Sequence, residues 1–81
     1  MRAFRKFGCQ VQSLAAVGKG CPDLLIAARG ALHLVEVKDG NKPPSAQQLT
    51  PDQTKWHKDW GCVHIVRSVD EVVELVEEWA A

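Results

Sequence analysis

The sequence PDLLIAARGALHLVEVK, residues 22–38, sets the fold of this chain. It contains two mostly apolar runs on either side of Arg29-Gly30. Short apolar runs separated by two residues of this kind are typical of a β-hairpin. Side chains alternate between the two faces of a strand, so Glu36 and Lys38 lie on one face, roughly 6.6 Å apart. The stretch therefore predicts an antiparallel hairpin with charged residues at one end.

Asp23 precedes the first run, and Glu36 and Lys38 close the second. The reversal brings the two carboxylates and the ammonium group together. Burial of an unpaired carboxylate costs on the order of several kcal/mol, so a cation is a natural counter-ion. Mg²⁺ prefers oxygen ligands, commonly one or two carboxylates, and keeps waters and a substrate oxygen. The group predicts a Mg²⁺ site for a phosphodiester, although each residue alone also fits a turn aspartate, a surface ion pair or a solvated lysine.

Periodicity and turn residues predict the remaining elements. We expect the last turns of a helix at 1–7, strands at 9–14, 24–28 and 31–38, a polar loop at 39–49, a helix at 50–60, a strand at 62–66 and a helix from 68 onward. The helix between the third and fourth strands makes those strands parallel. The sequence thus predicts one α/β domain over residues 1–81, with a mixed β-sheet flanked by helices in the order (α)βββαβα.

The predicted helix at 50–60 has clear signals at both ends. Thr50 and Gln53 have the spacing of a capping box, Pro51 suits the first helical position, and Gly61 ends the helix. Gln53 serves either this cap or a site beside the hairpin, and the sequence leaves both open. His57 follows one turn later and is the one histidine to test for a catalytic role, whereas the three tryptophans fit core or dimer contacts better than base stacking.

Net charge is zero, but the charges are unevenly distributed. Residues 1–67 carry all ten Lys and Arg residues against five acids, whereas residues 68–81 carry five acids and no base. The basic part predicts a phosphate-facing surface, or else scattered solvated side chains. Its candidates are Arg2, Arg5, Lys6, Lys19, Lys42, Lys55 and Lys58. In the glycine loop at 17–21, Gly18 and Gly20 either keep the chain thin where a phosphate approaches or form a plain turn. The loop lacks P-loop spacing, so no nucleotide cofactor is expected.

The bulk composition excludes several classes of protein. No apolar run approaches the ~18 residues of a membrane span, so no membrane partner is expected. The three cysteines are an odd number without CxxC spacing, which favours reduced thiols in the cytoplasm over disulfides or a zinc site. A chain of 81 residues has a marginal core, which a self-complementary dimer would extend.

The ordered motifs resemble a known family. Gly20-Cys21-Pro22-Asp23, then Glu36-Val37-Lys38, then Gln53 at the start of a helix are similar to the virus-type replication-repair nuclease (VRR-NUC) domain of the PD-(D/E)XK nuclease superfamily. The resemblance covers roughly residues 8 to 70 and implies a restriction-endonuclease-like core.

The resemblance also implies catalytic roles. Asp23 and Glu36 would bind Mg²⁺ with the Val37 backbone carbonyl, and Mn²⁺ would substitute. Lys38 would position or activate the attacking water, and Gln53 would lie beside the site.

The function implied is that of a metal-dependent, structure-selective DNA endonuclease. Relatives that stand alone act as dimers on branched DNA such as four-way (Holliday) junctions, so we expect a homodimer of phage or bacterial origin. Lys19, Gly20, Lys42 and Lys55 are the expected DNA contacts.

One feature departs from the family, whose members usually carry a fuller N-terminal helix with a Glu. Residues 1–8 contain no acid, so that helix is expected to be truncated. Two other functions therefore stay open, which are a catalytically inactive nuclease-derived module for DNA binding or assembly, and a small interaction protein with coincidental motifs.

Overall fold

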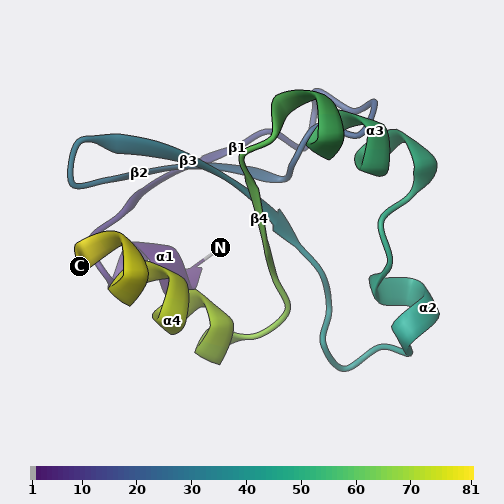
Figure 1. The fold of residues 1–81 in the computed structure, drawn as a ribbon. Helices are drawn as coiled ribbons and strands as arrows, with labels where there is room; N and C mark the ends of the chain where they lie inside the picture. The colour runs from purple at the N-terminus through teal and green to yellow at the C-terminus, as the bar shows by residue number, and fades with distance from the viewer. Residues whose placement is uncertain (1) are drawn as a thin grey trace.

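The computed structural model of the protein describes residues 2–81, and Met1, part of the predicted N-terminal helical turns, lies outside them. The chain forms a four-stranded sheet with helices on both sides (Figure 1). The elements are α1 (Arg2–Lys6), β1 (Gln10–Ser13), β2 (Leu24–Ala28), β3 (Ala31–Val37), α2 (Pro44–Gln47), α3 (Pro51–Trp60), β4 (Val63–Val66) and α4 (Val69–Ala80). The predicted order is confirmed, with one short helix added.

The sheet has the order β1-β2-β3-β4. The first two pairings are antiparallel and the last is parallel, so the predicted mixed sheet is confirmed. Leu24 lies opposite Val35, which in turn lies beside His64 of β4. Arg29 and Gly30 both have positive φ, at 51° and 81°, which is the requirement of the tight turn that joins twisted antiparallel strands.

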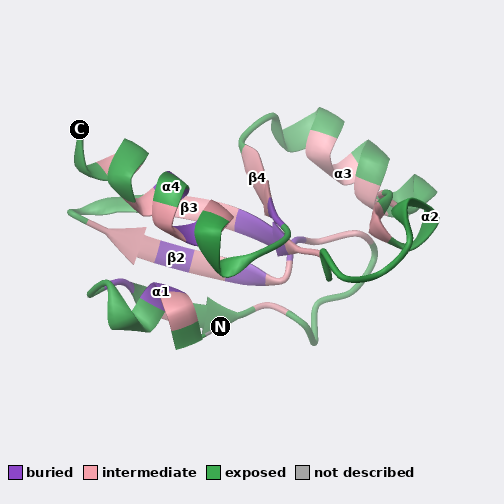
Figure 2. Ribbon diagram, turned by 90° about the horizontal axis from the view of Figure 1, so that it is seen from below, coloured by how far each residue is buried: buried purple, intermediate pink, exposed green. Residues whose placement is uncertain are grey.

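One face of the sheet carries the hydrophobic core. Phe4 of α1 and Val72 of α4 are fully buried against Ile26 and Val35 of the sheet. Figure 2 shows the buried segments of β2 and β3 where these two helices lie. Complete burial of side chains of this size contributes about 1.5–3 kcal/mol each. The core therefore fixes the hairpin and leaves its other face free for different contacts.

The opposite face is covered only in part. Strand alternation places Leu25, Leu34 and Glu36 on it, together with Leu32, which is 70% exposed. Helix α3 lies on this side of the sheet, near the ends of β3 and β4 (Figure 1). The polar site described below is built at this covered end.

The predicted polar loop at 39–49 is more ordered than expected, because it contains the helical turn α2. Two prolines at 43–44 favoured a loop, yet proline is well suited to the first turn of a helix. The Gln47 side-chain amide donates to the carbonyl of Lys42 at 2.6 Å. Gly40 donates its N–H to the carbonyl of Arg67 at 3.0 Å, so the loop is joined to the segment after β4.

Over the described residues, no helix has both the length and the apolar character that crossing a membrane requires.

Candidate metal centre

The hairpin brings Asp23 and Glu36 to the same end of the sheet. Asp23 directly precedes β2, and the pairing of Leu24 with Val35 sets it beside the last residues of β3. Its Oδ2 atom accepts a hydrogen bond of 2.8 Å from the backbone N–H of Val37. This bond fixes the Asp23 carboxylate against β3 and leaves its second oxygen outside the bond.

Glu36 is 2% exposed, and its environment disfavours the charged form. Burial is the largest cause that raises its pKa, to about 7, followed by hydrogen bonding to the Asp23 side chain and the charge of Asp23, with Lys38 acting in the opposite direction. The two carboxyl groups therefore share one small space. Burial first, and then the charges of Glu36 and Asp23, also raise the pKa of the Cys21 thiol.

Lys38 faces the same space from just beyond β3. Its Nζ atom lies 3.9 Å from Oε2 of Glu36 and donates a 2.8 Å hydrogen bond to Oε1 of Gln53. The side chain is only 12% exposed. The backbone N–H of Lys38 donates to the carbonyl of Val66, so the strand pairing continues through this residue. The ammonium group is thus held in one place by both the sheet and α3.

Gln53 fulfils both of the alternatives that the sequence leaves open. The Gln53 Oε1 atom accepts a hydrogen bond of 3.0 Å from the backbone N–H of Thr50. The backbone N–H of Gln53 donates to the Thr50 hydroxyl at 3.2 Å, so the capping box is complete. The same Oε1 atom accepts from Lys38 at 2.8 Å. One side chain therefore starts helix α3 and also holds the ammonium group at the site.

His57 lies one turn further along α3. Its Nε2 atom is 4.0 Å from Oε1 of Glu36, and neither atom has a hydrogen-bond partner in the described part of the chain. Burial first, and the charge of Lys38 second, lower the pKa of His57, and both therefore favour the neutral imidazole over an ion pair with Glu36. Helical spacing from Gln53 was the only signal in the sequence for the proximity of His57. For Cys21 the only signal was its position two residues before Asp23.

The expected DNA contacts occupy different places. Lys19, with a positive φ of 54°, and Lys55 line a shallow pocket of about 140 Å³ beside the tryptophans of α3. Lys55 forms an ion pair of 2.6 Å with Asp59. Gly20 is pressed against α3, since a Cβ atom there would lie 2.3 Å from the carbonyl oxygen of Asp52. Lys42 is exposed on the loop between β3 and α2.

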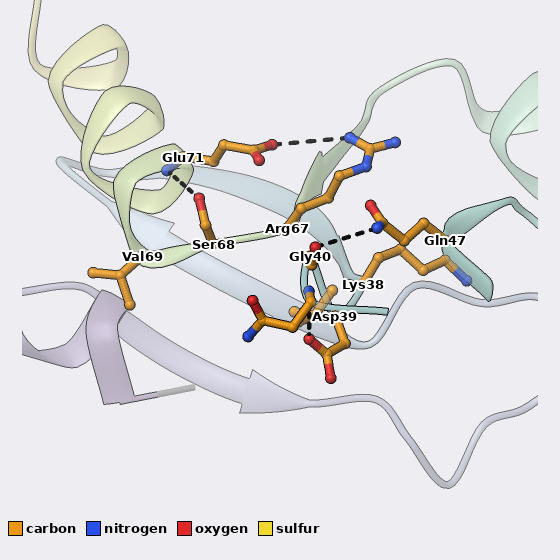
Figure 3. A pocket seen from close by; sticks show the side chains of 10 residues that line it. Lys38, Asp39, Gly40, Gln47, Arg67, Ser68, Val69 and Glu71 are labelled. Atoms are coloured by element: carbon orange, nitrogen blue, oxygen red, sulfur yellow. Dashed lines mark hydrogen bonds and ion pairs between the residues drawn. The ribbon is translucent and has the colours of Figure 1, made fainter. Parts of the chain in front are cut away.

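A larger groove of about 810 Å³ begins at Lys38 and extends to the start of α4 (Figure 3). The side chains of Gln47, Arg67 and Glu71 line it, and Arg67 lies 3.8 Å from the Glu71 carboxylate. The groove therefore joins the partly buried Lys38 to an open surface that carries both amide and guanidinium groups.

The donor set fits a magnesium ion better than a soft metal. Within residues 2–81, no three His, Cys, Asp or Glu side chains are grouped so as to hold a metal, so the protein supplies at most the two carboxylates and backbone carbonyls. Mg²⁺ commonly binds one or two carboxylates and completes its shell with water and substrate oxygens. Burial and the neighbouring Asp23 raise the pKa of Glu36 to about 7. A cation bound beside these two groups would stabilise the charged form of Glu36.

The arrangement of strands and helices, with paired carboxylates at the end of the hairpin and a lysine two residues further on, is that of a restriction-endonuclease-like nuclease core. A solved structure described as a VRR_NUC domain is 34% identical to this chain, with a TM-score of 0.68, over 94% of this chain and 84% of the other. No family model and no curated protein matches the sequence. The chain belongs to the VRR-NUC family, as the sequence motifs predicted.

The four predicted catalytic residues, Asp23, Glu36, Lys38 and Gln53, are brought together by the fold. The predicted DNA contacts form no single cluster, since Lys19 and Lys55 share one pocket and Lys42 lies on another loop. The roles assigned to these residues stay predictions.

Proposed function

We propose that this nuclease domain is a Mg²⁺-dependent endonuclease that hydrolyses DNA phosphodiesters at branches such as four-way junctions. One observation carries the proposal, which is the grouping of Asp23, Glu36 and Lys38 in a buried polar space at the end of the hairpin. The Glu36 carboxyl group, whose pKa is raised, and the neighbouring Asp23 carboxylate lie beside a fixed ammonium group, which matches what phosphodiester hydrolysis requires.

Asp23 and Glu36, with the backbone carbonyl of Val37, would hold the cation. A bound Mg²⁺ supplies charge neutralisation at the phosphate and a water of lowered pKa. Lys38, fixed by Gln53, provides three N–H donors at the edge of this site for the attacking water or for a phosphate oxygen. Gln53 keeps the ammonium group from turning away into solvent. Mn²⁺ substitutes for Mg²⁺ in this proposal because both accept carboxylate oxygens.

Selectivity for DNA structure rather than base sequence is supported by the kind of groups around the site. Lys19 and Lys55 on one side, and the groove from Lys38 to Arg67 on the other, offer cations suited to phosphates. Phosphate contacts orient a protein on DNA without carrying sequence information. The expected binding is strongly weakened by salt, because each phosphate contact releases counter-ions.

We also propose that the domain acts as a homodimer. The sheet face opposite the core exposes 70% of Leu32 and leaves Leu25 and Leu34 half-buried, so a second copy could cover these side chains. A two-fold dimer presents two equivalent sites, which suits paired cuts across a four-way junction.

The direct test is cleavage of a labelled four-way junction by the wild-type protein and by Asp23→Asn. We expect cuts with Mg²⁺ or Mn²⁺, none with EDTA, and little cleavage of a linear duplex of the same sequence. Asp23→Asn should abolish cleavage while junction binding in a gel-shift assay is largely kept. Metal-dependent cleavage by purified Asp23→Asn would contradict the proposed site.

The second candidate is a catalytically inactive module for DNA binding or assembly. It is favoured by helix α1, which carries no acidic residue and packs through Phe4 on the core face, away from Glu36. This candidate predicts salt-sensitive junction binding without metal-dependent nicking on branched, flapped or single-stranded DNA. Titration of the protein with Mn²⁺ in a calorimeter separates the two, because only the nuclease requires the cation.

A further inference from the structure

Two buried polar atoms face each other at the metal centre. Glu36 Oε1 and His57 Nε2 are both shielded from solvent and have no hydrogen-bond partner among residues 2–81. Their side chains are 2% and 13% exposed. A buried polar atom left unpaired costs about 1–3 kcal/mol, so two such atoms side by side call for a shared partner.

The separation of these atoms identifies that partner. At 4.0 Å they are too far apart for a direct hydrogen bond. One water molecule at about 2.8 Å from each atom would satisfy both, and buried waters commonly pair otherwise unsatisfied groups in this way. Glu36 Oε1 accepts a hydrogen bond from the water molecule, and His57 Nε2 forms a second hydrogen bond with the same water molecule.

Such a bridge would fix the direction of the Glu36 carboxylate. Its two oxygens have different neighbours, with Oε1 facing His57 at 4.0 Å and Oε2 facing Lys38 at 3.9 Å. Both neighbours are positioned by α3, which carries His57 and holds Lys38 through Gln53. A carboxylate that binds a metal usually needs a second hydrogen bond to keep its orientation.

We propose that His57 is a positioning residue, whose Nε2 atom holds Glu36 Oε1 through one water molecule and so keeps the Glu36 carboxylate turned toward Asp23. The inference rests on the proposed function, because it assumes that Asp23 and Glu36 bind a divalent cation together. His57 does not contact the cation in this account, and its effect on metal binding passes through Glu36.

The test compares His57→Met with His57→Gln. These side chains have the same length and both favour helices, but only glutamine offers hydrogen-bonding groups. Mn²⁺ affinity is measured by calorimetry without DNA, after thermal unfolding has shown that each variant is folded. We expect binding about tenfold weaker for His57→Met, whereas His57→Gln stays within about threefold of the wild type.

His64 provides the matched control. It lies on the core face of the sheet, with its ring 5.6 Å from that of Trp79. His64→Met and His64→Gln should both leave Mn²⁺ affinity unchanged. The comparison separates the loss of a particular hydrogen-bonding group from the general effect of replacing a histidine.

Equal Mn²⁺ affinity for wild type and His57→Met would overturn the inference, and so would equal weakening by both His57 variants, which would indicate a role in packing. If the wild type binds no Mn²⁺ at all, the proposed function itself fails. A crystal structure of the wild-type protein gives a second measurement should His57→Met not fold. The inference requires an ordered water within hydrogen-bonding distance of both atoms, and its absence there contradicts it.

Discussion

Glu36 lies where burial and the neighbouring Asp23 side chain disfavour a negative charge. The side chain is 2% exposed, Asp23 adds a second negative group, and the Lys38 ammonium group remains 3.9 Å away. Groups held in this way are typical of functional sites, because stability is lost there in exchange for binding. The protein without metal should therefore gain stability when the charge at this position is removed.

We predict that Glu36→Gln stabilises the metal-free protein at pH 8. The pKa of Glu36 in the folded protein is raised to about 7 from the ordinary 4.5, so the folded state binds this proton more tightly than the unfolded state. The stability that this proton contributes is fully present below pH 4.5 and is lost as the pH rises through 7. The difference corresponds to about 3 kcal/mol at most. Urea unfolding in EDTA at pH 5 and pH 8 measures it.

The wild type should lose stability between these two pH values, whereas Glu36→Gln should lose much less. Mg²⁺ should restore the wild type at pH 8 and leave the variant unchanged. If Glu36→Gln is less stable than the wild type by the same amount at both pH values, the charge of Glu36 does not destabilise the folded protein.

At this scale the sequence predicted the approach of Asp23, Glu36 and Lys38, because strand alternation and a two-residue turn determine it. It could not predict that Asp23 bonds to the N–H of Val37, or that His57 lies 4.0 Å from Glu36. Those contacts depend on the exact ends of the hairpin and on how α3 packs on the sheet, which local patterns do not encode.

Helix α3 is the element that completes the site. It begins at the Thr50 cap, presents Gln53 to Lys38 and His57 to Glu36, and ends at Gly61 with a φ of 73°. Its first turn is in contact with the loop before β2. The backbone of Asp52 in this turn lies so close to Gly20 that a side chain at position 20 would not fit. The position of α3 therefore depends on this loop as well as on its own cap.

We predict that Gly20→Ala displaces α3 and impairs cleavage. A Cβ atom at this position would lie 2.3 Å from the carbonyl oxygen of Asp52, and the backbone φ of +83° is unfavourable for alanine. We expect a loss of more than about 2 kcal/mol in unfolding free energy, together with reduced junction cleavage.

Gly18→Ala is the matched control, because φ is +70° there but nothing lies within 4 Å of the added atom. It should cost about 1 kcal/mol and keep cleavage. Chemical unfolding and junction cleavage are measured for both variants. Wild-type cleavage by Gly20→Ala would show that the loop does not position the helix.

Gln53→Ala and Thr50→Ala separate capping from function. Both remove one half of the capping box and should cost about 1 kcal/mol. Only Gln53→Ala also releases Lys38. We therefore predict similar urea midpoints but at least about tenfold slower cleavage for Gln53→Ala. Equal cleavage rates for the two variants would reduce Gln53 to a helix cap.

The ends of α3 and the order of the strands along the chain were predictable, since caps, glycines and alternation are local signals. The short helix α2 was not, because Pro43 and Pro44 resemble a loop until the Gln47 side chain is seen to close the turn on Lys42. This side-chain hydrogen bond joins residues five apart, a spacing that no local pattern of the sequence marks.

The whole molecule has two unequal sheet faces. One is sealed by α1 and α4, and the other is covered only where α3 lies. Composition indicated a marginal core, but only the three-dimensional arrangement identifies the face that is left open. The five acidic residues after position 67 all belong to α4, and helix α1, which contacts α4, carries three basic residues and no acid.

We predict that the protein is a dimer in solution and that Leu32→Lys makes it monomeric. Leu32 is 70% exposed on the open face, where an added charge would have to be buried in the dimer. Val69→Lys is the control, because Val69 is 58% exposed at the start of α4. Sedimentation equilibrium gives the mass of each. A monomeric wild type, or a Leu32→Lys dimer as tight as the wild type, would contradict this interface.

The central claim is that Asp23 and Glu36 hold one divalent cation between them. Anomalous diffraction from a crystal of the wild-type protein soaked in Mn²⁺ tests it most directly. The account predicts a manganese peak about 2.1 Å from carboxylate oxygens of both residues, with Lys38 alongside. No peak between them, in a protein that binds Mn²⁺ in solution, would contradict the account.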